Sequence, residues 1–297
     1  MNRRHFLATV PAMAALSAWS AEWPIGCNQY AWGTFYRREK KDWDADLDAS
    51  LAAFASSGLT AYEPSITRPE QISRLIPLLQ KHRLTMPSLY VNTLLHKEQE
   101  AKQSVDEVLA IAREARKAGA RIVVTNPSPI KWGGPENKSD AELMTQARYL
   151  DDLGARLRSE GMTLAYHTHD VELRAAGREF HHMMLATDPA HVHLCLDAHW
   201  VYRGSGNSQV ALFDIVELYG RRIAAVHLRQ SVGGTWSETF QAEGDIDYKR
   251  LSDRFRDLKI HPYLVLEQCL EAASPNTLNA VAAHREDLRN VRNLFRS

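Results

Sequence analysis

Short runs of apolar and β-branched residues alternate along this chain with longer stretches in which apolar residues recur every three or four positions. The short runs, which are bounded by Gly, Pro or Asn, predict strands at 24–31, 59–63, 85–91, 121–125, 162–167, 192–197, 223–228 and 262–267. The longer stretches predict helices around 44–57, 70–82, 101–118, 139–159, 178–186, 209–219, 248–258 and 276–294.

Strands that alternate with helices indicate βαβ units and a parallel sheet. Eight such units without a linker between them favour a single (β/α)₈ TIM barrel over a doubly wound sheet. A doubly wound sheet normally carries a glycine-rich phosphate turn after its first strand, and residues 28–33 (Asn-Gln-Tyr-Ala-Trp-Gly) contain no such turn. We therefore expect one barrel domain over residues 21–297.

The composition narrows the choice of partners. The chain has 36 Lys and Arg against 36 Asp and Glu, so its formal net charge is zero. Binding to nucleic acid or to an anionic membrane calls for a basic excess, so we expect neither partner. Cys27, Cys195 and Cys269 are widely spaced and form no CxxC pair, which argues against a disulfide framework or a zinc knuckle. These features suit a globular enzyme that acts on a small molecule.

The first twenty residues have the pattern of an export signal. Arg3 and Arg4 precede an apolar stretch, 7–16, which small residues close at 17–21. The stretch is too short to span a bilayer, and the arginine pair is typical of the twin-arginine export signal. We expect residues 1–20 to be removed and the mature protein to be periplasmic or otherwise exported, free of the membrane. An ordinary signal peptide or an N-terminal helix is the alternative.

Ionisable residues end several of the predicted strands. The active site of a barrel lies at the C-terminal ends of its strands, and side chains along a strand alternate in direction. On that alternation one face of the fifth strand carries His167 at its end and His169 just beyond it. The same face carries Asp197, His227 and Glu267 at the ends of the sixth to eighth strands and Glu63 at the end of the second. Ionisable groups are rarely buried without a partner, so we expect a shared divalent cation. Carboxylate and imidazole ligands suit Mn²⁺, Mg²⁺, Co²⁺, Zn²⁺ or Fe²⁺ and do not select one of them.

Several of these segments also resemble one known family. Residues 163–173 (Thr-Leu-Ala-Tyr-His-Thr-His-Asp-Val-Glu-Leu) are similar to the YHNHDFEF signature of xylose-isomerase-like TIM barrel proteins, the sugar isomerase/epimerase superfamily. Residues 194–200 resemble the LDxxW strand end of that family, 225–229 its HLK strand, and 264–267 its final xVE strand. The four segments occur in the family's order along the chain.

The resemblance implies a metal site of Glu, Asp, His and Glu on strands five to eight. Asp197, His227 and Glu267 match three of these positions directly, whereas the fifth-strand ligand is either His167 or Glu172. We favour Glu172, because it preserves the charge of a site with two glutamates and one aspartate. His167 and His169 are then acid/base candidates that face the substrate, and Glu267 and Glu63 are further catalytic candidates.

Other residues are candidates for binding the substrate. Trp200 can stack on a sugar face, or alternatively seal the barrel top, and Glu63 binds a substrate hydroxyl or pairs with an arginine. Trp32, Trp132 and Trp236 lie in predicted loops at the same rim, and Asn126 and Arg229 end or follow strands there. Trp200 and the pair Arg229-Gln230 depart from the family pattern, which argues against a simple ketose 3-epimerase.

We expect a divalent-metal-dependent isomerase or epimerase that removes a proton next to a metal-chelated carbonyl of an unphosphorylated sugar or keto-sugar. Two alternatives stay open: a metal-dependent lyase or dehydratase acting on a keto-glycoside or inositol derivative, and a non-catalytic exported barrel that binds sugar. A phosphodiesterase ranks lower, since 90–92 and 125–127 lack further His or Asp ligands. The sequence leaves the sugar, the metal and a possible homo-oligomer undetermined.

Overall fold

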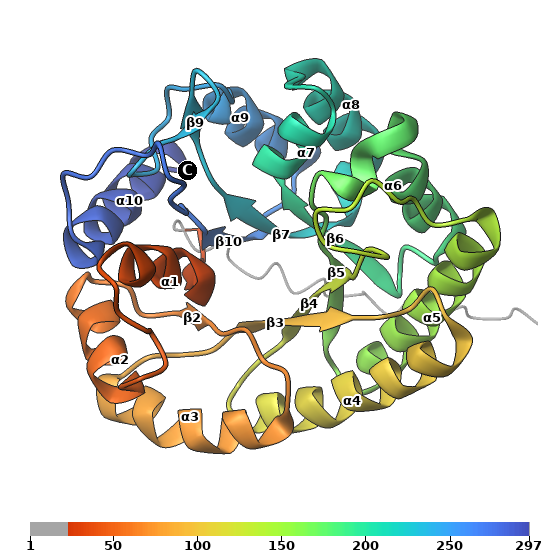
Figure 1. The fold of residues 1–297 in the computed structure, drawn as a ribbon, viewed down its shortest axis with the longest axis horizontal. Coiled ribbons are helices and arrows are strands. Elements are labelled where there is room, and N and C mark those ends of the chain that lie inside the picture. The colour runs from red at the N-terminus through yellow and green to blue at the C-terminus, as the bar shows by residue number, and fades with distance from the viewer. Residues whose placement is uncertain (1–22, 297) are drawn as a thin grey trace, which may run out of the picture.

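Parallel strands lie at the centre of the molecule, and helices surround them (Figure 1). The structure, a computed structural model, describes residues 23–296, so the predicted export signal at 1–20 lies outside the described residues. The strands of the large sheet follow the order β2-β1-β10-β7-β6-β5-β4-β3. Their bounds are β1 (Ile25–Asn28), β2 (Tyr62–Glu63), β3 (Ser88–Thr93), β4 (Ile122–Pro127), β5 (Thr163–Tyr166), β6 (Val192–Asp197), β7 (Ile223–Leu228) and β10 (Tyr263–Leu266).

The two edges of this sheet meet. Parallel bridges from Ala61 to Thr85 and from Ser65 to Tyr90 join the β2 segment to the β3 segment, so the eight strands form a nearly closed barrel. The predicted single (β/α)₈ TIM barrel is confirmed.

Helices follow the strands and form the outer layer (Figure 1). They are α1 (Gln29–Arg38), α2 (Leu47–Ser56), α3 (Pro69–His82), α4 (Glu98–Lys117), α5 (Asp140–Ser159), α6 (Arg174–Ala186), α7 (Ala198–Gly204), α8 (Gln209–Tyr219), α9 (Tyr248–Leu258) and α10 (Ala280–Leu294). Two short 3₁₀ turns, η1 (Val171–Leu173) and η2 (Gly220–Arg222), and a small antiparallel hairpin of β8 (Ser231–Val232) and β9 (Thr235–Trp236) complete the fold. Within 23–296, every helix is too short or too polar to cross a bilayer.

Two helices begin directly at strand ends and were not predicted. The strand predicted at 24–31 ends at Asn28, whose side chain accepts a hydrogen bond from the backbone N–H of Tyr30 and so caps α1. Asp197 ends β6 and caps α7 in the same way, by accepting a 2.8 Å hydrogen bond from the Trp200 N–H. In both places a polar residue that ends a strand also starts a helix.

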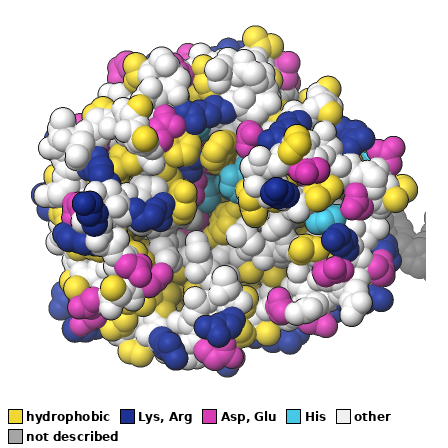
Figure 2. Space-filling model, in the orientation of Figure 1, with side chains coloured by type: hydrophobic (Ala, Val, Ile, Leu, Met, Phe, Trp, Pro, Cys, Tyr) yellow, Lys and Arg dark blue, Asp and Glu magenta, His cyan; other side chains and the backbone are white. Residues whose placement is uncertain are grey.

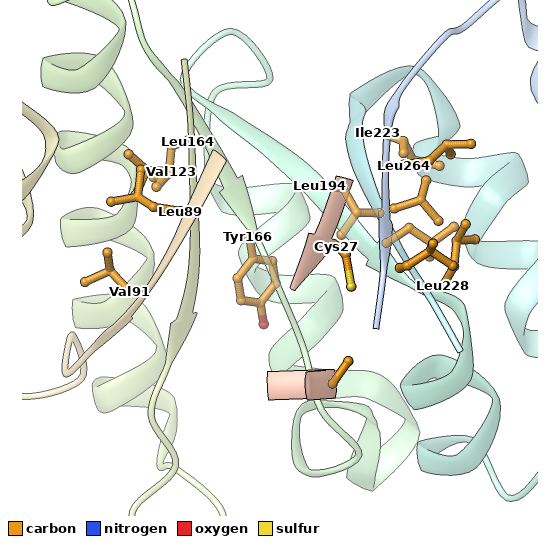
Figure 3. Packing of buried hydrophobic residues seen from close by; sticks show 14 of the residues in the cluster. Cys27, Leu89, Val91, Val123, Leu164, Tyr166, Leu194, Ile223, Leu228 and Leu264 are labelled. Atoms are coloured by element: carbon orange, nitrogen blue, oxygen red, sulfur yellow. The ribbon is translucent and has the colours of Figure 1, made fainter. Parts of the chain in front are cut away.

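Apolar side chains pack on both the outer and the inner face of the barrel. Outward-facing residues such as Leu89, Val123 and Leu164 pack between the strands and the helices (Figure 3). A separate buried cluster fills the barrel interior and consists of Val124, Ala165, Cys195, Ala225, Tyr263 and Val265. Three of these interior residues are small, and the polar residue two positions further along each chain segment is His167, Asp197 or His227. The alternation along β5, β6 and β7 therefore places these polar residues near the barrel axis, on the C-terminal side of the buried apolar cluster.

Candidate metal centre

Four ionisable side chains converge at the C-terminal end of the barrel. His167 follows β5, Asp197 ends β6, His227 lies in β7 and Glu267 follows β10. All four are buried, and one ligand atom from each lies within 4.8 Å of the others. We call these four residues the rim cluster. Two imidazoles and two carboxylates form a donor set that suits a divalent transition metal or magnesium.

The contacts inside the rim cluster leave ligand atoms without partners. His167 Nε2 lies 3.5 Å from Asp197 Oδ2, and His227 Nδ1 lies 3.2 Å from Glu267 Oε2. Three buried atoms, the two ring nitrogens of His167 and Oδ2 of Asp197, have no hydrogen-bond partner among the described residues. Buried polar atoms are almost always satisfied. A cation bound between His167 Nε2 and Asp197 Oδ2 would satisfy both of these atoms, so the residues fit a metal.

Neighbouring charges keep the two carboxyl groups ionised. Burial alone would raise the pKa of Asp197, but His167 and Arg229 hold it well below its usual range. Burial would likewise raise the pKa of Glu267, yet Arg229 and His227 lower it to about 2. Both carboxylates are therefore available as anionic ligands at neutral pH.

Glu172 does not belong to the rim cluster. Its Oε1 accepts a 3.0 Å hydrogen bond from Asn126 Nδ2, and its Oε2 accepts a 2.7 Å hydrogen bond from the His169 N–H. Burial, with Glu179 nearby, raises the pKa of Glu172 to about 7. The structure thus brings His167, rather than the favoured Glu172, together with Asp197 and the other two residues.

Glu63 lies beneath the rim cluster. The side chain is fully buried, and its Oε1 is 3.0 Å from His227 Nε2. It accepts hydrogen bonds from Asn28 and Ser88 and pairs with no arginine among the described residues. Burial acts to raise the pKa of Glu63, but His227 and these hydrogen bonds bring it below its usual value.

A cavity of about 420 Å³ opens above the rim cluster, and Figure 2 shows a hollow with histidine and hydrophobic side chains at the centre of this face. His167, His169, Arg229 and Glu267 supply the ionisable part of its wall together with Asp170. Its aromatic wall consists of Tyr30, Tyr90, Trp132, Trp200 and Trp236. A second hollow, of about 320 Å³, lies at the opposite end of the barrel and contains none of these side chains.

Two of the groups in the cavity wall have free polar atoms. The ring of His169 lies 5.0 Å from that of Trp132 and 5.4 Å from that of Trp200, and burial, helped by His167, lowers the pKa of His169 to about 3. Its imidazole is therefore neutral at physiological pH. Arg229 donates from Nη2 to Glu267 Oε2 at 2.6 Å, whereas its buried Nη1 has no hydrogen-bond partner among residues 23–296.

The predicted substrate-binding residues divide into two groups. Trp200 and Arg229 line the cavity, as do Trp132 and Trp236. Trp32 lies on α1 in the core, where its ring stacks on His284 at 4.3 Å, so it does not reach the cavity. Asn126 is buried behind the wall and donates to the His167 carbonyl and to Glu172.

Sequence reasoning missed two aromatic residues of the cavity. Tyr90 projects inward from β3, and its ring lies 5.4 Å from that of His167. Tyr90 lies two positions before Asn92, near the end of the third strand predicted at 85–91, so the alternation that selected Asp197 also indicates Tyr90. Tyr30 lies on the unpredicted α1, and no signal in the sequence places it at the rim.

Comparisons with known proteins agree with this architecture. The model of the family described as "Xylose isomerase-like TIM barrel" matches residues 51–294. Inosose dehydratase from Clostridium perfringens is 26% identical over 204 residues, which cover 59% of this chain and 67% of that protein.

Solved structures share the fold at low sequence identity. A D-allulose 3-epimerase from Methylomonas sp., in complex with D-allulose, has a TM-score of 0.70 at 14% identity and covers 93% of this chain and 98% of its own. A xylose isomerase-like TIM barrel protein from Mycobacterium smegmatis, in complex with magnesium, has a TM-score of 0.69 at 13% identity. The match covers 93% of this chain and 98% of that protein. At such identity these two structures establish the fold alone.

Proposed function

Because the chain belongs to the xylose isomerase-like TIM barrel family, we propose that it is a divalent-metal-dependent enzyme that isomerises or epimerises an unphosphorylated sugar or keto-sugar. The observation that carries this proposal is the rim cluster, in which His167, Asp197, His227 and Glu267 converge beneath an open cavity with aromatic walls. Sugar sites commonly combine aromatic rings, which stack on C–H surfaces, with a few oriented polar groups.

The chain's own residues supply binding, orientation and a proton acceptor. A divalent cation held by the rim cluster would supply Lewis acidity to two neighbouring oxygens of a hydroxy-ketone, which acidifies the adjacent C–H bond. His169 lines the same cavity with a neutral ring, so it can accept the proton from carbon and return it to another position or face. Arg229 Nη1, which has no hydrogen-bond partner within 23–296, is positioned to donate to a substrate oxygen.

The charge of the cavity supports a substrate without phosphate. Arg229 is the one Lys or Arg among the described residues that line the cavity, and Glu267 already pairs with it. A phosphate group carries about two negative charges at neutral pH and would lack a free cation in this cavity. Inosose and D-allulose, the compounds in the names of the two enzymes above, are polyhydroxy ketones without phosphate, which agrees with this choice.

A dehydratase is the second candidate, and the similarity to inosose dehydratase favours it. Removal of the same proton leads to either outcome. If the proton returns to carbon the product is an isomer or epimer, whereas loss of a β-hydroxyl gives an unsaturated ketone and water. The two reactions therefore share the rim cluster and His169 and differ in the fate of the β-substituent.

An exchange assay tests the proposed function. The mature protein, freed of metal and reloaded with Mn²⁺ or Mg²⁺, is mixed with unphosphorylated ketoses, 3-keto-glycosides and inososes in ²H₂O. Wild-type protein should exchange one carbon-bound proton for deuterium only when the metal is present, and NMR after quenching identifies the position. New isomers support the epimerase, and an unsaturated ketone supports the dehydratase.

Asp197→Asn is the matched variant for this assay, because it removes a charged ligand and keeps the side-chain shape. We expect this variant to lose both metal and exchange. Sugar binding that persists without metal, and without exchange in any substrate of the panel, would instead indicate the non-catalytic barrel.

We also propose that residues 1–20 direct export by the twin-arginine route, on the basis of the Arg3-Arg4 pair and the apolar stretch after it. Replacement of both arginines by lysine should retain the full-length chain in the cytoplasm, whereas the wild-type chain should appear in the periplasm without these residues. Export that is unaffected by the double replacement would indicate an ordinary signal peptide.

A further inference from the structure

Glu63 is a buried carboxylate that the mechanism above does not use. It ends β2, is fully buried, and is not among the residues that line the cavity, so a substrate in the cavity does not touch it. Burying a carboxylate is costly unless it is paired and hydrogen-bonded. Its partners therefore indicate what it does.

Three contacts fix the Glu63 carboxylate. Asn28, from the neighbouring strand β1, donates from Nδ2 to Oε1 at 2.7 Å, and Ser88 of β3 donates from Oγ to Oε2 at 2.5 Å. The third contact is with His227, whose buried Nε2 lies 3.0 Å from Oε1 and has no hydrogen-bond partner among the described residues. Both neighbours of β2 thus hold the carboxylate so that one oxygen lies against the His227 ring.

The two nitrogens of His227 have different surroundings. Nε2 lies against Glu63, below the cavity, whereas Nδ1 lies 3.2 Å from Oε2 of Glu267, which does line the cavity. A histidine that binds a metal through one nitrogen usually donates the other N–H to a carboxylate or carbonyl, which fixes its tautomer and orientation.

We propose that Glu63 is a positioning residue for the metal centre: it accepts the Nε2–H of His227 and so leaves the Nδ1 lone pair for the cation. This inference rests on the proposed function, because it requires the rim cluster to bind a metal. It assigns Glu63 a role through His227 in place of direct contact with the substrate.

Metal affinity of purified, metal-free protein tests the proposal, measured by calorimetric titration with Mn²⁺. Glu63→Ala should raise the dissociation constant by about 10–100-fold, the usual effect of losing the partner of a ligating histidine. Glu63→Gln keeps an oxygen that accepts Nε2–H and should bind at least threefold more tightly than Glu63→Ala. Glu238→Ala is the matched control, since it removes a buried carboxylate that pairs with Arg38 outside the cavity and should stay within threefold of wild type.

The outcomes separate this inference from the proposed function. Wild-type protein that binds no Mn²⁺ contradicts the proposed function, whereas Mn²⁺ affinity of Glu63→Ala within threefold of wild type overturns the role of Glu63 alone. If Glu63→Ala does not fold, imidazole ¹⁵N NMR of wild-type protein loaded with diamagnetic Zn²⁺ decides. A proton on Nε2 of His227 supports the proposal, and a proton on Nδ1 overturns it.

Discussion

Asp197 serves both local structure and the rim cluster with the same carboxylate. Oδ1 accepts the N–H of Trp200 and starts α7, while Oδ2 is buried in the rim cluster and has no hydrogen bond from the part of the chain that the structure describes. The sequence predicted the position of Asp197 at a strand end but not its capping role. A strand-end aspartate is compatible with either role, and the choice depends on the chain that follows it.

His169 provides a direct test of catalysis as distinct from metal binding. Because its neutral ring lines the cavity outside the rim cluster, His169→Gln should lower the rate of proton exchange by about 10²–10⁴-fold. The Mn²⁺ affinity of the variant should stay within threefold of wild type. His181→Gln, on α6 and outside the cavity, serves as the control and should change neither quantity. Exchange by His169→Gln within tenfold of wild type would exclude His169 as the proton acceptor.

His284, which lies outside the rim cluster, gives a pH-dependent prediction for stability. Its ring is buried against Trp32, and burial lowers the pKa of His284 from 6.5 to about 4. Below pH 6.5 the unfolded chain binds a proton here that the folded chain does not, so stability falls as the pH drops from 6.5 towards 4. A shift of this size corresponds to about 3 kcal/mol, fully present above pH 6.5.

The variant His284→Phe keeps a ring in this position and removes the titration. Between pH 7 and pH 4 the unfolding free energy of the variant should fall by about 3 kcal/mol less than that of wild type, as measured by urea denaturation at each pH. If the unfolding free energies of the two proteins change in parallel over this pH range, protonation of His284 is not the cause of the loss.

At the scale of elements, the first residues of α6 form an unusual turn. Ala175, Ala176 and Gly177 have positive φ angles of 50°, 60° and 68°, which form a left-handed turn directly after η1. Only Gly177 adopts this conformation without a steric cost, because it has no Cβ. The helix predicted at 178–186 corresponds to the part of α6 that follows this turn.

Replacement of Ala176 by glycine should relieve part of that cost. Ala176 is exposed, so Ala176→Gly should raise the unfolding free energy by about 0.5–1 kcal/mol, after allowing for the greater freedom of the unfolded chain. Ala52→Gly, at an exposed position in α2, is the matched control and should lower it by about 1 kcal/mol. Chemical denaturation that gives losses of similar size for both variants would contradict the account of this turn.

The strands were easier to predict than the connections between them. Buried parallel strands such as β6 have a clear apolar run, and the alternation along β6 and β7 correctly predicts which side chains face inward. The helices α1 and α7 were missed because each starts directly after a strand, whose last residue, Asn28 or Asp197, caps the helix. Capping depends on the backbone geometry of the turn, which the apolar pattern does not encode.

At the scale of the whole molecule, closure of the barrel brings the site together. Glu63 and His227 are far apart in the chain and belong to β2 and β7, yet their side chains lie 3.0 Å apart. The sequence predicted which strand ends carry ionisable groups, because that depends on local alternation. It did not distinguish His167 from Glu172, since that choice depends on how the chain turns after β5 to direct Glu172 towards Asn126.

The central claim, that the rim cluster binds one divalent cation, is tested most directly by anomalous diffraction from crystals of the protein grown with Mn²⁺. We expect a single strong peak at the C-terminal end of the barrel, with Asp197, His227 and Glu267 each about 2.0–2.4 Å away and His167 as the fourth protein ligand. A map without a peak between these side chains, or with its main peak elsewhere, would contradict the claim.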